Sequence, residues 1–278
     1  MSQWISAADA PVVTGKIDDN TNNRSADGAS WFLCTVKNKK KVTKALWQTT
    51  GLGVYYLYAN GMPVGNEILK PSFTHFEKTK RSFTYDITCL LSLKSKAENV
   101  LSVQMTPGWW GDKIITPSGH EGMVGQKCAF RGVLELTYSD GTKQLFGTDR
   151  DHWKAGVAGP VRHASYSSPS TREPMGYDNA GHFTQPVINT EFNGDILPTN
   201  GAEVYYRRDL TLKPTKAYKW KGITGSSEEE HGKVVITKKY AVGEEMTISP
   251  GETLVIDFGQ NCSAVPSFVF KAKEGTID

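Results

Sequence analysis

The amino-acid sequence predicts an all-β protein: an antiparallel β-sandwich of the jelly-roll or galactose-binding-like kind, followed by part or all of a second β-sandwich-type domain. Three observations predict this fold class. Short runs rich in β-branched and aromatic residues recur between turns that contain Gly, Pro or Asn. The dipeptides Asn60-Gly61 and Asp140-Gly141, typical of tight hairpins, each separate two such runs. No segment keeps a 3.6-residue apolar period over the ~10–12 residues that indicate a helix.

The expected strands of the first domain follow one another closely. They span residues 31–36, 42–50, 52–59, 62–64, 82–87, 99–104, 126–139 and 142–146. Asn60-Gly61 accepts the positive φ angles of a two-residue turn, so we expect strand 52–59 to fold back on 62–64. Asp140-Gly141 predicts a second hairpin between the last two strands, and Leu90-Leu91 predicts a brief turn of helix.

The character of the sequence changes between residues 151 and 200. Gly, Pro, Ser, Asn and His dominate this stretch with little periodicity, so we expect a long loop, which in a compact domain is commonly functional. Strand patterns return at residues 202–212, 233–242, 252–258 and 265–272. We therefore divide the chain into a lead-in segment (1–27), a sandwich (28–200) and a second β domain (201–278), which we expect to be truncated.

The charge balance and the apolar pattern exclude two classes of partner. The 32 basic and 29 acidic residues give a net charge of +3, which is too small for the single-sign field that attracts nucleic acid or anionic membranes. No apolar run reaches the ~20 residues that span a bilayer. We therefore expect no nucleic-acid partner and no membrane insertion.

Sequence motifs for common enzymatic chemistry are missing. There is no GKS/T loop, no GxSxG elbow and no HExxH pair. The four cysteines, Cys34, Cys89, Cys128 and Cys262, lie far apart without the spacing of zinc ligands. Cys34 and Cys128 fall in expected strands, where a buried thiol is the ordinary role, while disulfides stay open as an alternative.

Trp109 and Trp110, flanked by Gly108 and Gly111, are candidates for carbohydrate binding. If the pair lies on a strand, its side chains face opposite sides, so one ring enters the core and the other lies at a surface or under a loop. A flat, exposed indole matches the apolar C–H face of a sugar ring. The alternative is structural: one ring packs inward and the long loop covers the other.

Oxygen-bearing side chains gather in or beside the expected loop. They are Asp149, Asp151, Glu173, Asp178 and Asn179. Carboxylate and amide oxygens suit calcium, which takes about six to eight such ligands. Paired carboxylates also serve glycoside hydrolysis, although the sequence gives no separation between them. A polar loop without a ligand is the third interpretation.

Several short motifs occur along the chain in a specific order. They are the Tyr-rich run 54–59 with Asn60-Gly61, Pro71, Tyr85-Asp86-Ile87-Thr88, Asn99-Val100-Leu101, Gly108-Trp109, Thr148-Asp149, Trp153 and Gly159-Pro160-Val161. This order resembles the N-terminal β-sandwich domain of bacterial α-L-rhamnosidases of glycoside hydrolase family 78. Glu173 with Tyr177-Asp178 is similar to the family's Gly-Glu-x-Tyr-Asp-Ala-Arg stretch, and 257–261 is similar to the Asp-Phe-Gly-Gln-Asn run that opens its next β domain.

The resemblance implies that this chain and the catalytic residues belong to different domains of a longer protein. In that family the acid and base carboxylates lie in a helical barrel that follows these β domains. We therefore expect no catalytic residue in this chain, which alone would be inactive. We expect its parent to carry a C-terminal catalytic domain that hydrolyses α-L-rhamnosides by inversion, outside the cytoplasm in the extracellular space or the periplasm.

The resemblance also implies candidate ligand residues. Some members bind rhamnose through a calcium ion in the related sandwich. By similarity we expect Asp178 and Asn179 to hold calcium, and Glu173, Asp178 and Asn179 to contact a glycan together with the two tryptophans. The alternative function is a free-standing carbohydrate-binding or adhesion module without a catalytic domain, and a third is a sandwich that only supports its neighbour and binds nothing.

Overall fold

The computed structural model describes residues 2–9, 29–111, 125, 127–157, 183–201, 203–224, 233–249, 252–267 and 269. The chain divides into two compact units, Met1–Tyr206 and Arg207–Asp278. Strands dominate both units. The described helical elements are short: η1 (Thr88–Leu90), α1 (Gly108–Gly111) and η3 (Arg208–Leu210). The predicted fold class is confirmed, because the described chain is nearly all-β with several antiparallel sheets.

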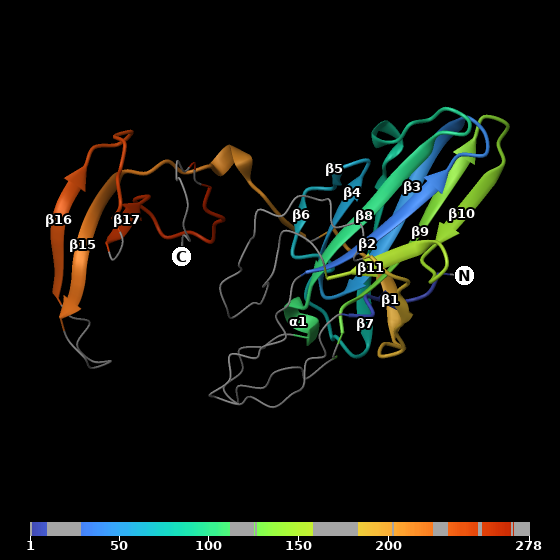
Figure 1. Cartoon of the computed structure of the whole chain (residues 1–278), viewed down its shortest axis with the longest axis horizontal. Coiled ribbons are helices and arrows are strands. Elements are labelled where there is room, and N and C mark those ends of the chain that lie inside the picture. Colours follow the sequence, from blue (N-terminus) through green and yellow to red (C-terminus); the bar gives the residue numbers. More distant parts are fainter. Residues whose placement is uncertain are drawn as a thin grey trace. The chain divides into compact units, whose positions relative to one another are not determined.

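The larger sheet of the first unit has seven strands (Figure 1). The strands are β1 (Ile5–Ser6), β3 (Val42–Leu52), β7 (Thr79–Asp86), β9 (Ala129–Tyr138), β10 (Lys143–Gly147), β12 (Val187–Ile188) and β13 (Asp195–Pro198). Their order is β12–β1–β9–β3–β7–β13, and β10 pairs with β9. The neighbours are antiparallel except β13, which runs parallel to β7 and sets Ile196 opposite Lys80.

A five-stranded antiparallel sheet forms the second layer, in the order β11–β2–β8–β4–β5. Its strands are β2 (Ser30–Lys37), β4 (Val54–Ala59), β5 (Met62–Val64), β8 (Glu98–Thr106) and β11 (Trp153–Gly156). A separate short pair joins β6 (Glu67–Ile68) to β14 (Val204–Tyr205).

The hydrophobic core lies between the two main sheets. Along β9, buried residues alternate with half-exposed ones, which is the two-residue period of a strand with one face inside. The Phe130 ring lies between 5.6 and 6.2 Å, centroid to centroid, from the rings of Phe32, Trp47, Tyr55 and Trp153. These rings come from both sheets, so the aromatic cluster holds the two layers together.

Both predicted hairpins are confirmed. Asn60 and Gly61 have φ angles of 49° and 78°, and β4 pairs with β5 across them. The Asn60 side chain ties this turn to its surroundings, because its Nδ2 donates to the Leu90 carbonyl at 2.9 Å and its Oδ1 accepts from the Val100 N–H at 2.8 Å. Across Asp140-Gly141, β9 pairs with β10.

The stretch 151–200, expected as a long loop, carries three short strands in its described part. These are β11, β12 and β13. Each has only two to four residues, too few to show an alternating pattern. The strand expected at 202–212 is confirmed only in part: among its described residues, β14 (Val204–Tyr205) is a strand and Arg208–Leu210 form the short helix η3.

The cysteines carry no disulfide. None of the four is joined to another, and Cys34 and Cys128 are buried whereas Cys89 and Cys262 are exposed. The prediction that Cys34 and Cys128 serve as buried thiols is confirmed. Burial raises the pKa of the Cys34 thiol to about 12, so this thiol stays protonated and unreactive at neutral pH.

The second unit contains a three-stranded antiparallel sheet in the order β16–β15–β17. The strands are β15 (Lys216–Thr224), β16 (Lys233–Tyr240) and β17 (Thr253–Asp257). The sequence analysis missed β15. No strand covers the described residues of the run 265–272, so the strand expected there is wrong for those residues. Where burial is described in this unit, Ala217 and Tyr240 are the buried hydrophobic residues.

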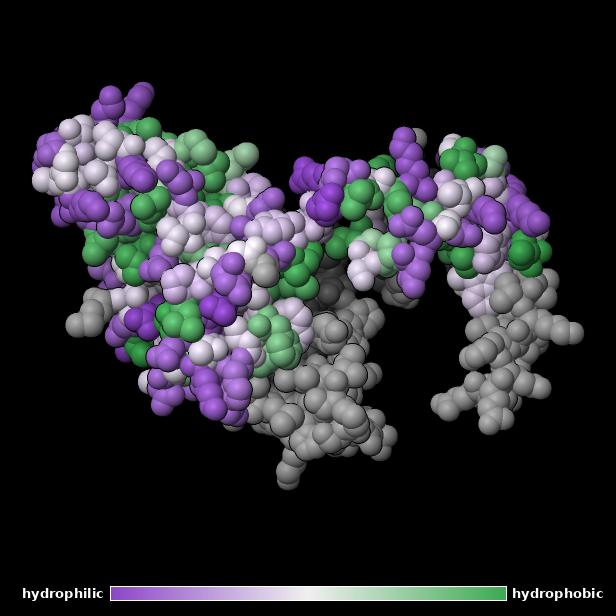
Figure 2. Space-filling view, turned by 180° about the vertical axis from the view of Figure 1, so that it is seen from behind, coloured by the Kyte–Doolittle hydropathy of each residue, from purple (hydrophilic) through white to green (hydrophobic). Residues whose placement is uncertain are grey.

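Apolar side chains are scattered over the exposed surface. On the face that Figure 2 shows, hydrophobic residues are interspersed with hydrophilic ones and form no single continuous area. Phe73 and Leu145 are among the most exposed large ones, at 65% and 63%. Within the described ranges, no helix has both the length and the apolar character to cross a bilayer.

Candidate functional site

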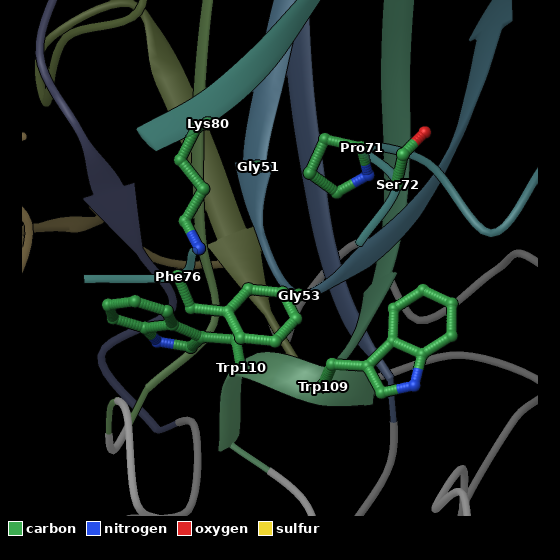
Figure 3. Close-up of a pocket in the computed structure, with 8 residues that line it drawn as sticks. All are labelled: Gly51, Gly53, Pro71, Ser72, Phe76, Lys80, Trp109 and Trp110. Carbon is green, nitrogen blue, oxygen red and sulfur yellow. The ribbon is translucent and has the colours of Figure 1, made fainter. Parts of the chain in front are cut away.

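A small pocket opens at the end of the sandwich where β3, β7 and α1 approach one another (Figure 3). Its lining residues are Gly51, Gly53, Pro71, Ser72, Phe76, Lys80, Trp109 and Trp110. Its empty volume of about 190 Å³ includes open solvent at the mouth, so the enclosed space is far below the ~300–1,000 Å³ of pockets that enclose a whole ligand. The enclosed part has room for about one water molecule, so the pocket is a shallow recess.

Trp109 and Trp110 lie in a helical turn, so the strand geometry expected for them is wrong. Gly108 leaves β8 with a φ angle of 48°, and the Pro107 carbonyl accepts from the N–H groups of Trp110 and Gly111. These contacts close the single turn α1. Figure 3 shows the two indoles pointing to different sides of this turn. Trp110 is buried and Trp109 is half-buried.

Trp110 is fixed from two sides. Its indole Nε1 donates a hydrogen bond to the Lys127 carbonyl at 3.1 Å. Gly125 lies against the ring so closely that a Cβ there would be 2.0 Å from Cε2. The ring also meets Phe192 edge to face at 6.4 Å. Trp110 is thus part of the wall that shapes the pocket.

Lys80 is the charged residue of the pocket lining. It belongs to β7, is only 2% exposed, and points its Nζ towards Phe76 and Trp110 (Figure 3). Nζ lies 4.5 Å from the centroid of the Trp110 ring, 4.6 Å from that of Phe76 and 5.5 Å from that of Phe192. Desolvation by burial lowers the pKa of Lys80 to about 7. Cation–π contacts of this kind contribute about 0.5–2 kcal/mol each.

The rim of the pocket is aromatic. Phe73 meets Phe76 edge to face at 4.8 Å and Trp109 at 5.8 Å. Phe73 is largely exposed, and Trp109 is half-exposed. The rim therefore presents flat apolar surfaces beside an opening that contains a cation.

Two polar side chains next to the pocket are already engaged. The Ser72 hydroxyl donates to the carboxylate of Glu203, and the Thr199 hydroxyl donates to the same carboxylate. Glu203 thus has two hydroxyl partners of its own. The Ser72 proton is used in this contact and is not directed at the pocket.

The structure describes only some of the oxygen-bearing side chains that were predicted as ligands. Glu173, Asp178 and Asn179 lie outside the described residues, so their roles stay predictions. Asp149 accepts hydrogen bonds from the backbone N–H groups of Asp151 and His152, which is the local turn of a polar loop. In the described part of the chain, no three His, Cys, Asp or Glu side chains gather as a metal site would require.

Sequence reasoning missed Lys80, the residue that gives the pocket its charge. The segment Lys78-Thr79-Lys80-Arg81 reads as a solvated basic run. The two-residue period of a strand could have indicated that Lys80 is buried, because Lys80 shares a face of β7 with Ser82 and both are buried.

The sequence of the chain is similar to known proteins along much of its length. The family described as "Alpha-L-rhamnosidase N-terminal domain" matches residues 40–193. An alpha-L-rhamnosidase of Alteromonas sp. (strain LOR) is 28% identical over 242 residues, covering 85% of this chain and 23% of that protein. One of Streptomyces avermitilis is 32% identical over 146 residues, covering 51% of this chain and 14% of that protein. The chain thus spans less than a quarter of the length of these relatives.

Solved structures share the fold. The native alpha-L-rhamnosidase of Aspergillus terreus aligns with a TM-score of 0.62 and 19% identity, covering 84% of this chain and 25% of that one. The Streptomyces avermitilis enzyme complexed with L-rhamnose gives 0.61 and 19%, with 84% and 26% covered. The Dictyoglumus thermophilum enzyme gives 0.61 and 16%, with 92% and 32% covered. At these identities the likeness establishes the β architecture.

Proposed function

Since this chain belongs to the family of α-L-rhamnosidase N-terminal domains, we propose that it is the non-catalytic β-domain region of an α-L-rhamnosidase and that it binds carbohydrate. The parent hydrolyses α-L-rhamnosides, with inversion, through a catalytic domain that follows these units. Such a reaction uses two carboxyl groups ~6.5–9.5 Å apart with a water between them. This chain supplies support for that domain and contacts to the glycan.

One observation carries the carbohydrate-binding part of the proposal: the half-exposed indole of Trp109 at the mouth of the pocket. Beside it lies the exposed ring of Phe73, 5.8 Å away. A sugar ring offers an apolar C–H face that packs against such a surface, while its hydroxyls stay in water. A shallow recess lies beside this surface.

Calorimetric titration of the purified chain with L-rhamnose tests this proposal. We expect binding heat, and Trp109→Ala should weaken binding by about 1–3 kcal/mol, by analogy with the stacking of nucleic-acid bases on aromatic side chains. Leu145→Ala, which removes an exposed apolar side chain from β10, is the matched control. Equal affinity of the Trp109→Ala variant and the wild type for L-rhamnose would mean that Trp109 has a structural role only.

Calcium is part of the proposal through Asp178 and Asn179. Their carboxylate and amide oxygens are the hard ligands that calcium prefers, and Glu173 lies close to them in the sequence. The rhamnose titration repeated with calcium and with a chelator tests this assignment. Heat that needs calcium and is lost in Asp178→Ala would support it, whereas heat that persists in both cases would contradict it.

The assignment of catalysis to another domain can be tested directly. The purified chain, incubated with a chromogenic α-L-rhamnoside, should release no chromophore above the buffer rate. Hydrolysis by this chain alone would overturn the assignment of catalysis to another domain.

A further inference from the structure

Exposed lysines gather at one end of the sandwich, on two loops that are hydrogen-bonded to each other. One loop connects β2 to β3, and the other connects η1 to β8. The six exposed side chains, which we call the lysine surface, are Lys37, Lys39, Lys40, Lys41, Lys94 and Lys96. This surface concentrates positive charge in a chain whose net charge is only +3.

Two buried asparagines fix the two loops to each other. Asn38 is 1% exposed, and its Nδ2 donates to the carbonyls of Ser92 and Lys94 at 2.7 and 2.9 Å. The Asn38 carbonyl accepts from the Lys96 N–H at 2.9 Å. Asn99, also 1% exposed, donates from Nδ2 to the Asn38 Oδ1 at 3.2 Å. The backbone under the lysine surface is therefore ordered before a ligand arrives, which reduces the entropy that binding costs.

Acidic side chains neutralise only part of the lysine surface. Glu98 lies 3.5 Å from the Lys37 ammonium group, and Asp140 pairs with Lys40. The other four lysines form no ion pair within the described part of the chain. Two carboxylates against six ammonium groups leave a local excess of positive charge, and such a surface attracts anions.

The chemistry of the lysine surface favours a polymer with repeated negative charges. A single exposed ion pair contributes little, whereas a polymer contacts several lysines at once. None of the exposed large hydrophobic residues of the described chain lies on the two loops. The surface thus lacks the aromatic rings on which nucleic-acid bases stack and the apolar anchors that protein or membrane partners use. A hydrated polysaccharide with charged substituents needs only the ammonium groups.

We propose that the lysine surface binds an acidic polysaccharide, whose sugars carry carboxylates or sulfate esters. The ammonium groups donate charge-assisted hydrogen bonds to the anionic oxygens along the polymer. This inference goes beyond the sugar contact proposed for Trp109, because the two surfaces are separate. The nine residues of β8, at ~3.3 Å each, place the lysine surface roughly 25 Å from α1.

Calorimetric titration of the wild-type chain with matched polymers tests the proposal. Polygalacturonate is compared with its neutral methyl ester, and dextran sulfate with dextran. At about 50 mM salt we expect at least one acidic polymer to bind ~10-fold or more tightly than its neutral counterpart. Its affinity should fall about tenfold or more at about 200 mM salt, because binding releases counterions. Equal affinities within both pairs, or no binding of either acidic polymer, would overturn the proposal.

Two variants of equal charge locate the binding. The first combines Lys39→Gln, Lys41→Gln, Lys94→Gln and Lys96→Gln. The control combines substitutions of four exposed lysines elsewhere, Lys78→Gln, Lys154→Gln, Lys213→Gln and Lys216→Gln. Each variant lowers the net charge from +3 to −1, but only the first should lose about tenfold or more affinity for the acidic polymer. An equal loss in both would mean that overall charge attracts the polymer, and would overturn the proposal.

A smaller variant keeps the test decisive if the fourfold variant lacks the wild-type circular dichroism spectrum. Lys39→Gln/Lys94→Gln changes one lysine on each loop and should cause a smaller loss of affinity. Lys78→Gln/Lys154→Gln is its control. Equal affinity of the Lys39→Gln/Lys94→Gln variant and the wild type for the acidic polymer would contradict the assignment to this surface.

Further arms separate this inference from other polyanions and from the proposed function. Double-stranded DNA, poly-L-glutamate or phosphatidylserine vesicles that bind more tightly than both acidic polysaccharides, at equal charge concentration, would overturn the assignment to a polysaccharide. Trp109→Ala should leave the affinity for the acidic polymer unchanged, and a loss in that variant would contradict two separate surfaces. Absence of heat with L-rhamnose, while the acidic polymer binds, would overturn the contact proposed at Trp109 and leave this inference standing.

Discussion

Two buried lysines, ten residues apart in the sequence, both lie against aromatic rings but differ in their acidic partner. Lys70 is 1% exposed, and its Nζ lies 3.8 Å from the Glu67 carboxylate and 3.4 Å from the Val64 carbonyl. Lys80 is 2% exposed and has aromatic rings in place of a described acid. Burial lowers the pKa of both, to about 8 for Lys70, where Glu67 opposes the shift, and to about 7 for Lys80. Lys70 therefore belongs to a structural ion pair, whereas the described neighbours of the Lys80 ammonium group are aromatic rings.

The largest expected effect is the loss of folding stability when Lys70 is replaced. Lys70→Met leaves the Glu67 carboxylate, which is 15% exposed, without its cation. Breaking a buried pair from one side commonly costs about 3 kcal/mol or more. We expect the free energy of unfolding, measured in urea, to fall by about that amount. Lys80→Met, the same substitution at the other site, is the control and should cause a clearly smaller loss at neutral pH.

The pH dependence of stability separates the two lysines next. The folded protein holds Lys80 at a pKa of about 7, below its ordinary 10.5, so the unfolded chain binds the proton more tightly. The contribution of Lys80 to stability therefore rises as pH climbs from about 7 to 10.5 and is lost as pH falls back. In Lys80→Met this slope is removed. From about pH 7 to pH 9, the free energy of unfolding of Lys80→Met should therefore fall by about 2–3 kcal/mol relative to that of the wild type.

Urea unfolding of the wild type and Lys80→Met at three pH values measures that difference. Lys70 and the other titrating groups contribute equally to both proteins, so they cancel in the comparison. A difference that stays constant from pH 7 to pH 9 would show that Lys80 titrates normally and is not held in a dry environment.

A smaller effect is expected when Glu67 is neutralised. Glu67→Gln keeps an acceptor for the Tyr85 hydroxyl, which donates to Glu67 at 2.9 Å, but removes the charge that favours protonated Lys70. We expect the pKa of Lys70 to fall below about 8 and the free energy of unfolding to fall by ~1–2 kcal/mol. Nuclear magnetic resonance titration of the lysine ε-carbons measures the first quantity. The resonance of Lys80 should not move, which makes it the internal control.

The smallest effect concerns one ring over Lys80. Phe76→Leu removes the ring that lies 4.6 Å from Nζ. Because a ring face favours the charged ammonium, the pKa of Lys80 should fall further, and stability at pH 6 should decrease by about 1 kcal/mol. The same titration reports the change. A rise in the pKa of Lys80 would instead mean that loss of the ring admits water to the ammonium group.

Local patterns were enough to predict much of the sandwich. The alternation along β2, β4, β8 and β9 is visible in the sequence, because one face of each strand is buried and the period is two. The Asn60-Gly61 turn could be predicted because positive φ angles are a property of those two residues alone.

The candidate site depends on contacts that a local pattern does not contain. Lys80 is buried because Phe192 and β13, more than one hundred residues later, pack beside β7. Trp110 turns inward because Gly108 closes a helical turn and Gly125 leaves space for the ring. The strands β11, β12 and β13 were missed for a related reason, since each is specified by its partner strand and not by its own few residues.

One outermost strand in each of the two main sheets contains a proline. β5 borders the smaller sheet and contains Pro63, and β13 borders the larger sheet and contains Pro198. Proline has no N–H to offer to an approaching chain, so neither border can extend into a continuous ladder with another molecule. These prolines therefore act against intermolecular aggregation at high protein concentration, and Pro63→Val or Pro198→Val would weaken that protection.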